Sequence, residues 1–146
     1  FSMECLWRRS RVCSPRLGQI DGLKCNRLEA AALLNCSAGA TPDQLVADLH
    51  QRGVDIVLLS LDSEGVQLGR AGQQLHFPLL EPPQTIASVA GAGDALLAGF
   101  LHSHFNGASD EAAMHFGLRA AQLSLTCTEA VHPGIASLCK EQTGAF

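Results

Sequence analysis

The sequence predicts an α/β fold, in which helices alternate with the strands of a sheet, and two observations lead to this prediction. The first is a capped helix, a glycine that ends it, and then VDIVLLS at 54–60, a short apolar run rich in β-branched residues. Runs of this kind fill strands that are covered on both faces of a sheet. The second is a short apolar run at 86–89 that leads through a turn of small residues into an apolar helix. Both orders of elements indicate an α/β domain.

The composition is that of a globular protein, with 47% apolar and 16% charged residues among 146. The apolar runs are too short for a bilayer span and no secretory signal is recognisable, so a cytoplasmic protein without a membrane partner is expected. Six cysteines, at 5, 13, 25, 36, 127 and 139, include no C-x-x-C pair. Neither a zinc site nor a disulfide framework is therefore predicted.

Residues 1–23 show no helical or strand period and are expected to form an irregular lead-in, with 24–146 as the functional portion. They hold four of the ten basic residues, whereas six basic residues stand against thirteen acidic ones from position 17 onward. An acidic body lacks the basic stripe that nucleic acids need, so no nucleic-acid partner is expected. The arginine-rich start is interpreted as a solvated or non-native lead-in, with a targeting tail, such as a mitochondrial one, as the alternative. Because the chain begins with Phe, we expect it to be a fragment.

The first half of the functional portion contains two helices with clear start signals. Leucine and alanine recur at helical spacing in RLEAAALL at 27–34, after Asn26 as N-cap and with Glu29 at the capping-box position. A second helix begins after the cap Thr41, carries proline in its first turn, and ends at Gly53.

Further elements follow the strand at 54–60. They are a turn at 62–65, a hairpin whose tip lies at 69–72, a short strand at 86–89, a helix at 94–105, another helix at 110–125 and a turn at 132–134. Asn106 and Gly107 end the first of these helices, and Ser109 caps the second.

Three small residues in succession, Gly91, Ala92 and Gly93, clear side chains from the backbone amides before Asp94. The amides and dipole at a helix start form a site for an anion such as a phosphate. A carboxylate beside a phosphate site has two readings of equal weight. Asp94 is either an ordinary acidic residue of a first helical turn or a general base that takes a proton from a substrate hydroxyl.

SVAGAGDALLAGFL at 88–101 resembles the C-terminal signature of the PfkB, or ribokinase-like, carbohydrate and nucleoside kinases, D-T-x-G-A-G-D followed by small residues and an apolar helix. Other segments resemble the family in the same order. They are the N-x-x-E segment at 25–34, the strand and turn VDIVLLSLDSEGVQL at 54–68, and the closing segment EAVHPGIASL at 129–138. The resemblance covers about 24–138.

The resemblance implies a ribokinase-like sheet with flanking helices, of which this chain is the C-terminal, nucleotide-binding part. It implies transfer of the ATP γ-phosphate to a hydroxyl of a sugar or nucleoside. By this resemblance, Asp94 is the catalytic base and the amides of Gly91, Ala92 and Gly93 form the anion hole. The nucleotide is bordered by Ser60, Asp62, Gly65 and the segment 121–126. Asn26 and Glu29 are indirect Mg²⁺ ligands. From the residues alone, a capping box is the favoured interpretation of Asn26 and Glu29.

Two departures from the family pattern affect the site. Ser88 and Val89 replace the Asp-Thr pair, which removes a carboxylate that helps to hold a monovalent cation in many relatives, so we expect no potassium activation. Asp62 stands where glycine is common, and its charge near the phosphates is expected to weaken ATP binding. The N-R-x-E-A segment and the V-H-P-G-I ending are similar to pseudouridine kinase-like members.

Family members are about twice as long, so we expect either a missing N-terminal half or a second copy in a homodimer to complete the site. One alternative function is a truncated, non-catalytic kinase remnant that at most binds nucleotide or a partner. Another is a small acyl- or nucleotide-binding α/β module that uses the same turn without phosphoryl transfer.

Overall fold

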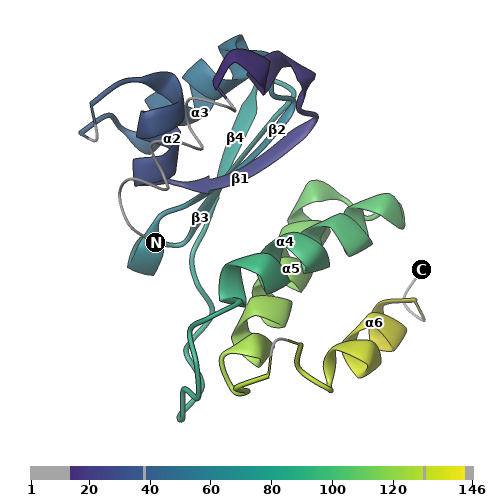
Figure 1. The fold of residues 1–146 in the computed structure, drawn as a ribbon. Coiled ribbons are helices and arrows are strands. Elements are labelled where there is room, and N and C mark those ends of the chain that lie inside the picture. Colours follow the sequence, from purple (N-terminus) through teal and green to yellow (C-terminus); the bar gives the residue numbers. More distant parts are fainter. Residues whose placement is uncertain (1–13, 38, 130, 144–146) are drawn as a thin grey trace. The chain divides into compact units, whose positions relative to one another are not determined.

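The structure is a computed structural model that describes residues 14–37, 39–129 and 131–143, and the chain divides after Pro78 into two units (Figure 1). The first unit contains the 3-10 helices η1 (Ser14–Gln19) and η2 (Asp62–Glu64), the strands β1 (Gly22–Asn26), β2 (Ile56–Ser60), β3 (Val66–Arg70) and β4 (Gln73–Phe77), and the helices α2 (Arg27–Leu34) and α3 (Pro42–Gln51). The second unit contains the helices α4 (Ala92–Phe105), α5 (Asp110–Ser124) and α6 (Ile135–Thr143).

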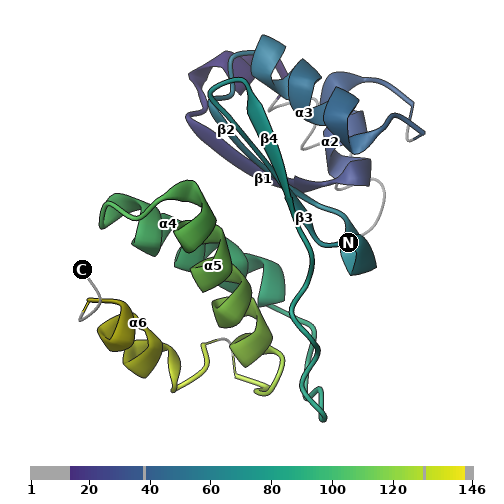
Figure 2. The ribbon, with the colours of Figure 1, turned by 180° about the vertical axis from the view of Figure 1, so that it is seen from behind.

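The strands of the first unit form one mixed sheet in the order β1-β2-β3-β4. β1 and β2 are parallel, with Asn26 opposite Ser60, and the other two pairs are antiparallel. α2 and α3 lie on one face of this sheet (Figures 1 and 2). The α/β class with flanking helices is therefore confirmed.

The core of the first unit lies between these helices and the sheet. The helix start signals predicted from the sequence are confirmed as well. Thr41 and Gln44 form a capping box at α3, and Gly53, at φ +99°, follows its end. The buried apolar side chains of this core include Ala30, Leu33 and Leu34 of α2, Leu45, Val46 and Leu49 of α3, and Val57 and Leu59 of β2.

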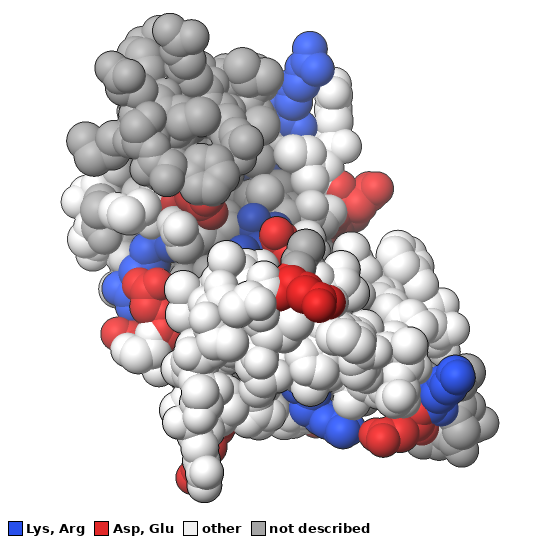
Figure 3. Space-filling view, turned by 60° about the horizontal axis from the view of Figure 1, so that its bottom comes forward, with Lys and Arg blue, Asp and Glu red and all other residues white. Residues whose placement is uncertain are grey.

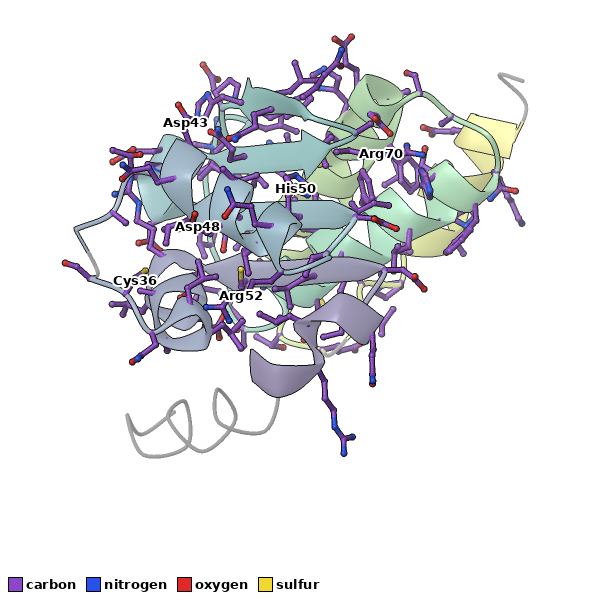
Figure 4. The ribbon with its side chains drawn as sticks, turned by 90° about the horizontal axis from the view of Figure 1, so that it is seen from above. Cys36, Asp43, Asp48, His50, Arg52 and Arg70 are labelled. Carbon is purple, nitrogen blue, oxygen red and sulfur yellow. The ribbon has the colours of Figure 1, made fainter. Side chains whose placement is uncertain are left out.

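Polar contacts add to this packing at the start of α3, where Asp43 lies (Figure 4). The buried amide of Gln67 donates to Asp43 Oδ1 at 2.5 Å and to Gln74 Oε1 at 2.8 Å. Gln74 in turn donates to the backbone carbonyl of Asp43 at 3.1 Å. Since a buried amide without partners is costly, this network holds α3 over β3 and β4.

The β3–β4 hairpin is tighter than expected, because its tip is Ala71 and Gly72 rather than 69–72. Both tip residues have positive φ, +51° and +77°, as two-residue hairpin turns with the twist of the strands require. Gly69 lies inside β3 instead. A Cβ there would be 2.6 Å from His50 Nε2 and closer still to Val46, so the glycine allows α3 to approach the sheet.

The described part of residues 1–23 corrects the expected irregular lead-in. Residues 14–19 form η1, β1 begins at Gly22, and Leu17 is buried in the core of the first unit. A Cβ on Gly53 would lie 2.9 Å from Gly18 Cα, so the backbone of η1 packs directly on the end of α3. Leu17 and Ile20 stand among polar residues and glycine without a helical or strand period, which is why the sequence did not predict this packing. Residues 1–13 lie outside the described residues.

α4 and α5 pack closely against each other in the second unit, because two glycines lie at their contact. A Cβ on Gly99 would lie 2.9 Å from Gly117 Cα, and one on Gly117 would lie 2.7 Å from the Leu96 carbonyl oxygen. The helices predicted at 94–105 and 110–125 are thus present, although α4 starts two residues earlier. α6 was not predicted. No helix in the described part of the chain is long and apolar enough to cross a membrane.

The strand predicted at 86–89 is wrong. These residues pair with no strand, and the described part of the second unit contains none. The N–H groups of Ala87 and Ser88 donate instead to the Leu125 carbonyl oxygen at the end of α5, at 2.8 and 3.4 Å. An apolar run forms a strand only where a partner strand supplies the ladder.

Candidate functional site

The start of α4 carries the residues that the sequence predicts as an anion site. Gly91 is the N-cap at φ +84°, a left-handed conformation that costs a residue with a side chain about 1–2 kcal/mol. Ala95 N–H donates to Gly91 O at 2.9 Å, and the N–H groups before it have no partner within the helix. No side chain caps this end. The amides at 91–94, which include the predicted set 91–93, and the helix dipole are therefore available to an anion.

Asp94 is the third residue of α4 and its side chain is exposed. Among the described residues, no hydrogen bond to its carboxylate is formed. A capping-box contact, in which this carboxylate would accept the N–H of the N-cap Gly91, is thus not made there. The carboxylate stands free at the same helix end as the amides, and its role as a base stays a prediction.

In the first unit, Asn26 and Ser60 end two neighbouring parallel strands and lie opposite each other. Ligands of open α/β sheets bind at this carboxyl edge of the strands. Ser60 Oγ donates to the Cys25 carbonyl oxygen at 3.2 Å, which ties the two strand ends together. The structure therefore brings these two predicted site residues to one edge.

Asn26 and Glu29 form the capping box that the residues alone favoured. Glu29 N–H donates to Asn26 Oδ1 at 2.8 Å, and Asn26 N–H donates to Glu29 Oε2 at 3.0 Å. The box uses one carboxylate oxygen and leaves Oε1 to other contacts. Because Mg²⁺ prefers oxygen ligands and keeps several waters, this carboxylate fits indirect binding of the ion through water.

The turn from Leu61 to Gly65 carries the other two predicted nucleotide residues. Asp62 is exposed and has φ +52°, a value that favours glycine. Gly65 has φ +104°, and a Cβ there would lie 2.9 Å from Pro78 Cα and closer still to the Phe77 carbonyl oxygen. The backbone itself thus requires glycine at position 65.

Cys25 directly precedes Asn26 but is no nucleophile. Burial, followed by the nearby Glu29 carboxylate, raises the pKa of its thiol to about 12. It stays protonated at neutral pH and packs in the core. Cys36 and Cys127 are also free thiols, and no cluster of metal-binding side chains occurs in the described ranges.

In the second unit, the segment at 121–126 borders a hollow of about 260 Å³. Its lining is Pro83, Arg119, Gln122, Leu123, Thr126 and Leu138. The α5 members recur at helical spacing on one face of that helix, a signal that the sequence contained, whereas Pro83 and Leu138 join them only in the folded chain. The predicted residues fall into two sets, 26–65 in the first unit and 91–94 with 121–126 in the second.

Two further features concern charge. Ser88 Oγ accepts the N–H of Ala90 at 3.1 Å, so position 88 supplies an uncharged hydroxyl in a local turn. On the face seen in Figure 3, the described basic side chains are scattered among acidic and uncharged ones and form no stripe.

Known proteins with similar sequences indicate the family of this chain. The pattern of the pfkB family carbohydrate kinases matches residues 3–136. The 1-phosphofructokinase of Haloferax volcanii is 35% identical over 100 residues, which are 67% of this chain and 32% of that protein. The pseudouridine kinase of Escherichia coli is 29% identical over 132 residues, which are 88% of this chain and 41% of that protein. This chain therefore spans well under half the length of these relatives.

The fold agrees as well. The ribokinase of Arabidopsis thaliana, solved with ribose and ATP, is similar with a TM-score of 0.73 and 27% identity over 87% of this chain and 43% of that one. The mixed sheet with flanking helices is thus a part of the ribokinase-like fold. Since the family pattern extends over nearly the whole chain and includes the small-residue turn before Asp94, the chain belongs to the pfkB family of carbohydrate kinases.

Proposed function

We propose that this chain is the nucleotide-binding part of an ATP-dependent kinase that phosphorylates a hydroxyl of a sugar or nucleoside. The observation that carries the proposal is the start of α4, where amides without helical partners and the free Asp94 carboxylate occur within one helical turn. Phosphoryl transfer needs these two functions together, because charge on the transferred group must be stabilised and the attacking hydroxyl must lose a proton.

In the proposed mechanism, the amides at 91–93 donate hydrogen bonds to the oxygens of the γ-phosphoryl group. Fixed donors of this kind stabilise the charge of the transition state without reorganising. Asp94 accepts the proton of the attacking hydroxyl as general base. The chain has few basic residues between 28 and 139, so these amides provide much of the stabilisation of the phosphoryl charge.

The nucleotide would lie along the edge formed by Ser60, Asp62 and Gly65, and residues 121–126 would also contact it. ATP in the Arabidopsis ribokinase supports this ligand. Magnesium, held through water by Glu29 Oε1 and organised by Asn26, would supply positive charge to the phosphates. Ser88 offers no carboxylate, so we propose that a monovalent cation is not required.

For the acceptor we propose pseudouridine or a similar nucleoside. The Escherichia coli pseudouridine kinase matches more of this chain than the Haloferax phosphofructokinase does, 88% against 67%. The N-R-x-E-A segment at 26–30 and the ending at 131–135 support the same class.

The test is the substitution Asp94→Asn in the complete kinase that contains this chain, with transfer of the ATP γ-phosphate to pseudouridine and to ribose as the readout. We expect turnover to fall about 100-fold or more, the range for loss of a general base, with ATP·Mg affinity within about twofold of wild type. Turnover near the wild-type value would refute the base assignment.

A second candidate, a non-catalytic remnant, is favoured by one observation, the exposed Asp62 carboxylate in the nucleotide turn. Calorimetry of ATP·Mg with the 146-residue chain, shown to be folded by circular dichroism, separates the two functions. Saturable binding that tightens in Asp62→Gly supports the kinase, because that variant removes the repulsion of the phosphates. A folded chain that ignores ATP in both forms supports the remnant.

A further inference from the structure

An ion pair joins the start of α2 to the turn between β2 and β3. Arg27 Nη2 lies 3.2 Å from Glu64 Oε2, and the two side chains are 37% and 67% exposed. Arg27 is the first residue of its helix and directly follows Asn26, and Glu64 lies in the same turn as Asp62 and Gly65. The pair therefore connects two segments that the proposed function places at the phosphates.

Several hydrogen bonds fix the β2–β3 turn around Glu64. Leu61 N–H donates to Gly65 O at 2.8 Å and Glu64 N–H donates to Leu61 O at 3.0 Å, so the turn has a defined shape. His76 Nε2 lies 2.6 Å from the Glu64 carbonyl oxygen, an acceptor, so this nitrogen carries the proton. Glu64 is thus attached to β4 through its backbone and to α2 through its side chain.

The two connected segments leave the sheet at the same place. Asn26 and Ser60 are register partners at the ends of parallel strands, and the chain continues from them into α2 and into the turn. The distance between α2 and the β2–β3 turn, beyond the strand ends, is not fixed by the hydrogen bonds that pair β1 with β2. The Arg27–Glu64 pair is a side-chain contact that joins the two segments there.

We propose that Arg27 is a positioning residue for nucleotide binding. By holding the Glu64 carboxylate, it keeps the β2–β3 turn at a constant distance from the Asn26–Glu29 capping box, without touching the nucleotide. The proposal rests on the proposed function, since it assumes that both segments meet ATP·Mg.

Glu64→Gln is the diagnostic variant, because electrostatics and positioning predict opposite results for it. Removing a carboxylate near the phosphates favours ATP binding if only charge matters. Removing the partner of Arg27 weakens ATP binding if the position of the turn matters.

The experiment measures ATP·Mg affinity of the 146-residue chain by calorimetry at low salt, where exposed pairs are least screened. We expect Arg27→Gln and Glu64→Gln each to weaken binding about two- to fivefold, the range for an exposed ion pair. The charge-reversed double variant Arg27→Glu with Glu64→Arg is expected to restore most of the loss. Asp48→Asn, which removes an exposed carboxylate of α3 outside the turn and the capping box, is the matched control and should leave affinity unchanged.

Hydrogen exchange of the peptide over 61–65, without nucleotide, gives a second readout. We expect faster exchange in both single variants and wild-type exchange in the double variant. Equal or tighter ATP binding by Glu64→Gln, with wild-type binding intact, would overturn the proposal while leaving the proposed function standing. A folded wild-type chain that binds no ATP would instead refute the proposed function.

Discussion

Gly65→Ala tests whether the glycine of the β2–β3 turn is required by the backbone. Gly65 has φ +104° and ψ −143°, a region that is nearly restricted to glycine and costs other residues about 1–3 kcal/mol. The new Cβ would also lie 2.9 Å from Pro78 Cα and overlap the Phe77 carbonyl oxygen, both backbone atoms. Forcing such a group into a packed site costs about 1–3 kcal/mol more.

The sum, about 2–6 kcal/mol, is a large part of the 5–15 kcal/mol that typically stabilises a domain. Hydrogen exchange of peptides from β3 and β4 reads the first unit by itself. Since about 1.4 kcal/mol corresponds to a factor of ten, we expect exchange through unfolding to accelerate at least about thirtyfold.

Gly72→Ala is the matched control in the same unit. Gly72 has φ +77° but nothing lies within 4 Å of its Cβ position, so only the conformational cost of about 1–2 kcal/mol remains. If both variants accelerate exchange equally, the steric part of the reasoning is wrong.

Three further predictions concern stability and titration. Gly117→Ala should destabilise the second unit by about 1–3 kcal/mol, because its Cβ would meet the Leu96 carbonyl oxygen at 2.7 Å; exchange in α4 peptides as slow as in wild type would contradict this. Asn26→Ala should cost about 0.5–2 kcal/mol in urea denaturation by loss of the N-cap, whereas Asn26→Asp should keep most of it, and equal losses would exclude the cap as the cause. The pKa of Cys25 rises from 9.0 to about 12 on folding, so the unfolded chain loses this proton first and stability should fall as pH rises from about 9 to 12. Urea midpoints compared with Cys25→Ala, which lacks the thiol, should show this slope only in the wild type.

For Asn26 and Glu29, a role in capping α2 is compatible with a role in binding magnesium through water. The capping box engages Asn26 Oδ1 and one oxygen of Glu29, and it fixes the direction of that carboxylate. A fixed carboxylate with one oxygen left is suited to hold a magnesium-bound water. The same local contacts that start α2 thus support the proposed ion site.

Much of the secondary structure followed from local signals. Thr41, Ser109 and Gly53 mark helix ends through contacts within a few residues, so their effect is independent of the rest of the chain. The helix start at 91–94, which we propose as an anion site, belongs to this group, because a glycine N-cap and the amides after it are properties of one helix end.

Other features depended on residues far apart in the sequence. Leu17 is in the core because η1 packs on the end of α3, and 86–89 is not a strand because its amides meet Leu125 instead of a partner strand. The Arg27–Glu64 pair spans 37 positions and exists only because β1 and β2 lie side by side.

By itself, the sequence determined the family, the α/β class, most helix ends and the glycine N-cap of α4, since each arises from residues close together in the chain. Only the tertiary structure decided which apolar runs form strands, why Gly65 and Gly69 must lack side chains, and how the β2–β3 turn is held beside the capping box. These features result from contacts between distant segments, whose free energy appears only when the sheet brings them together.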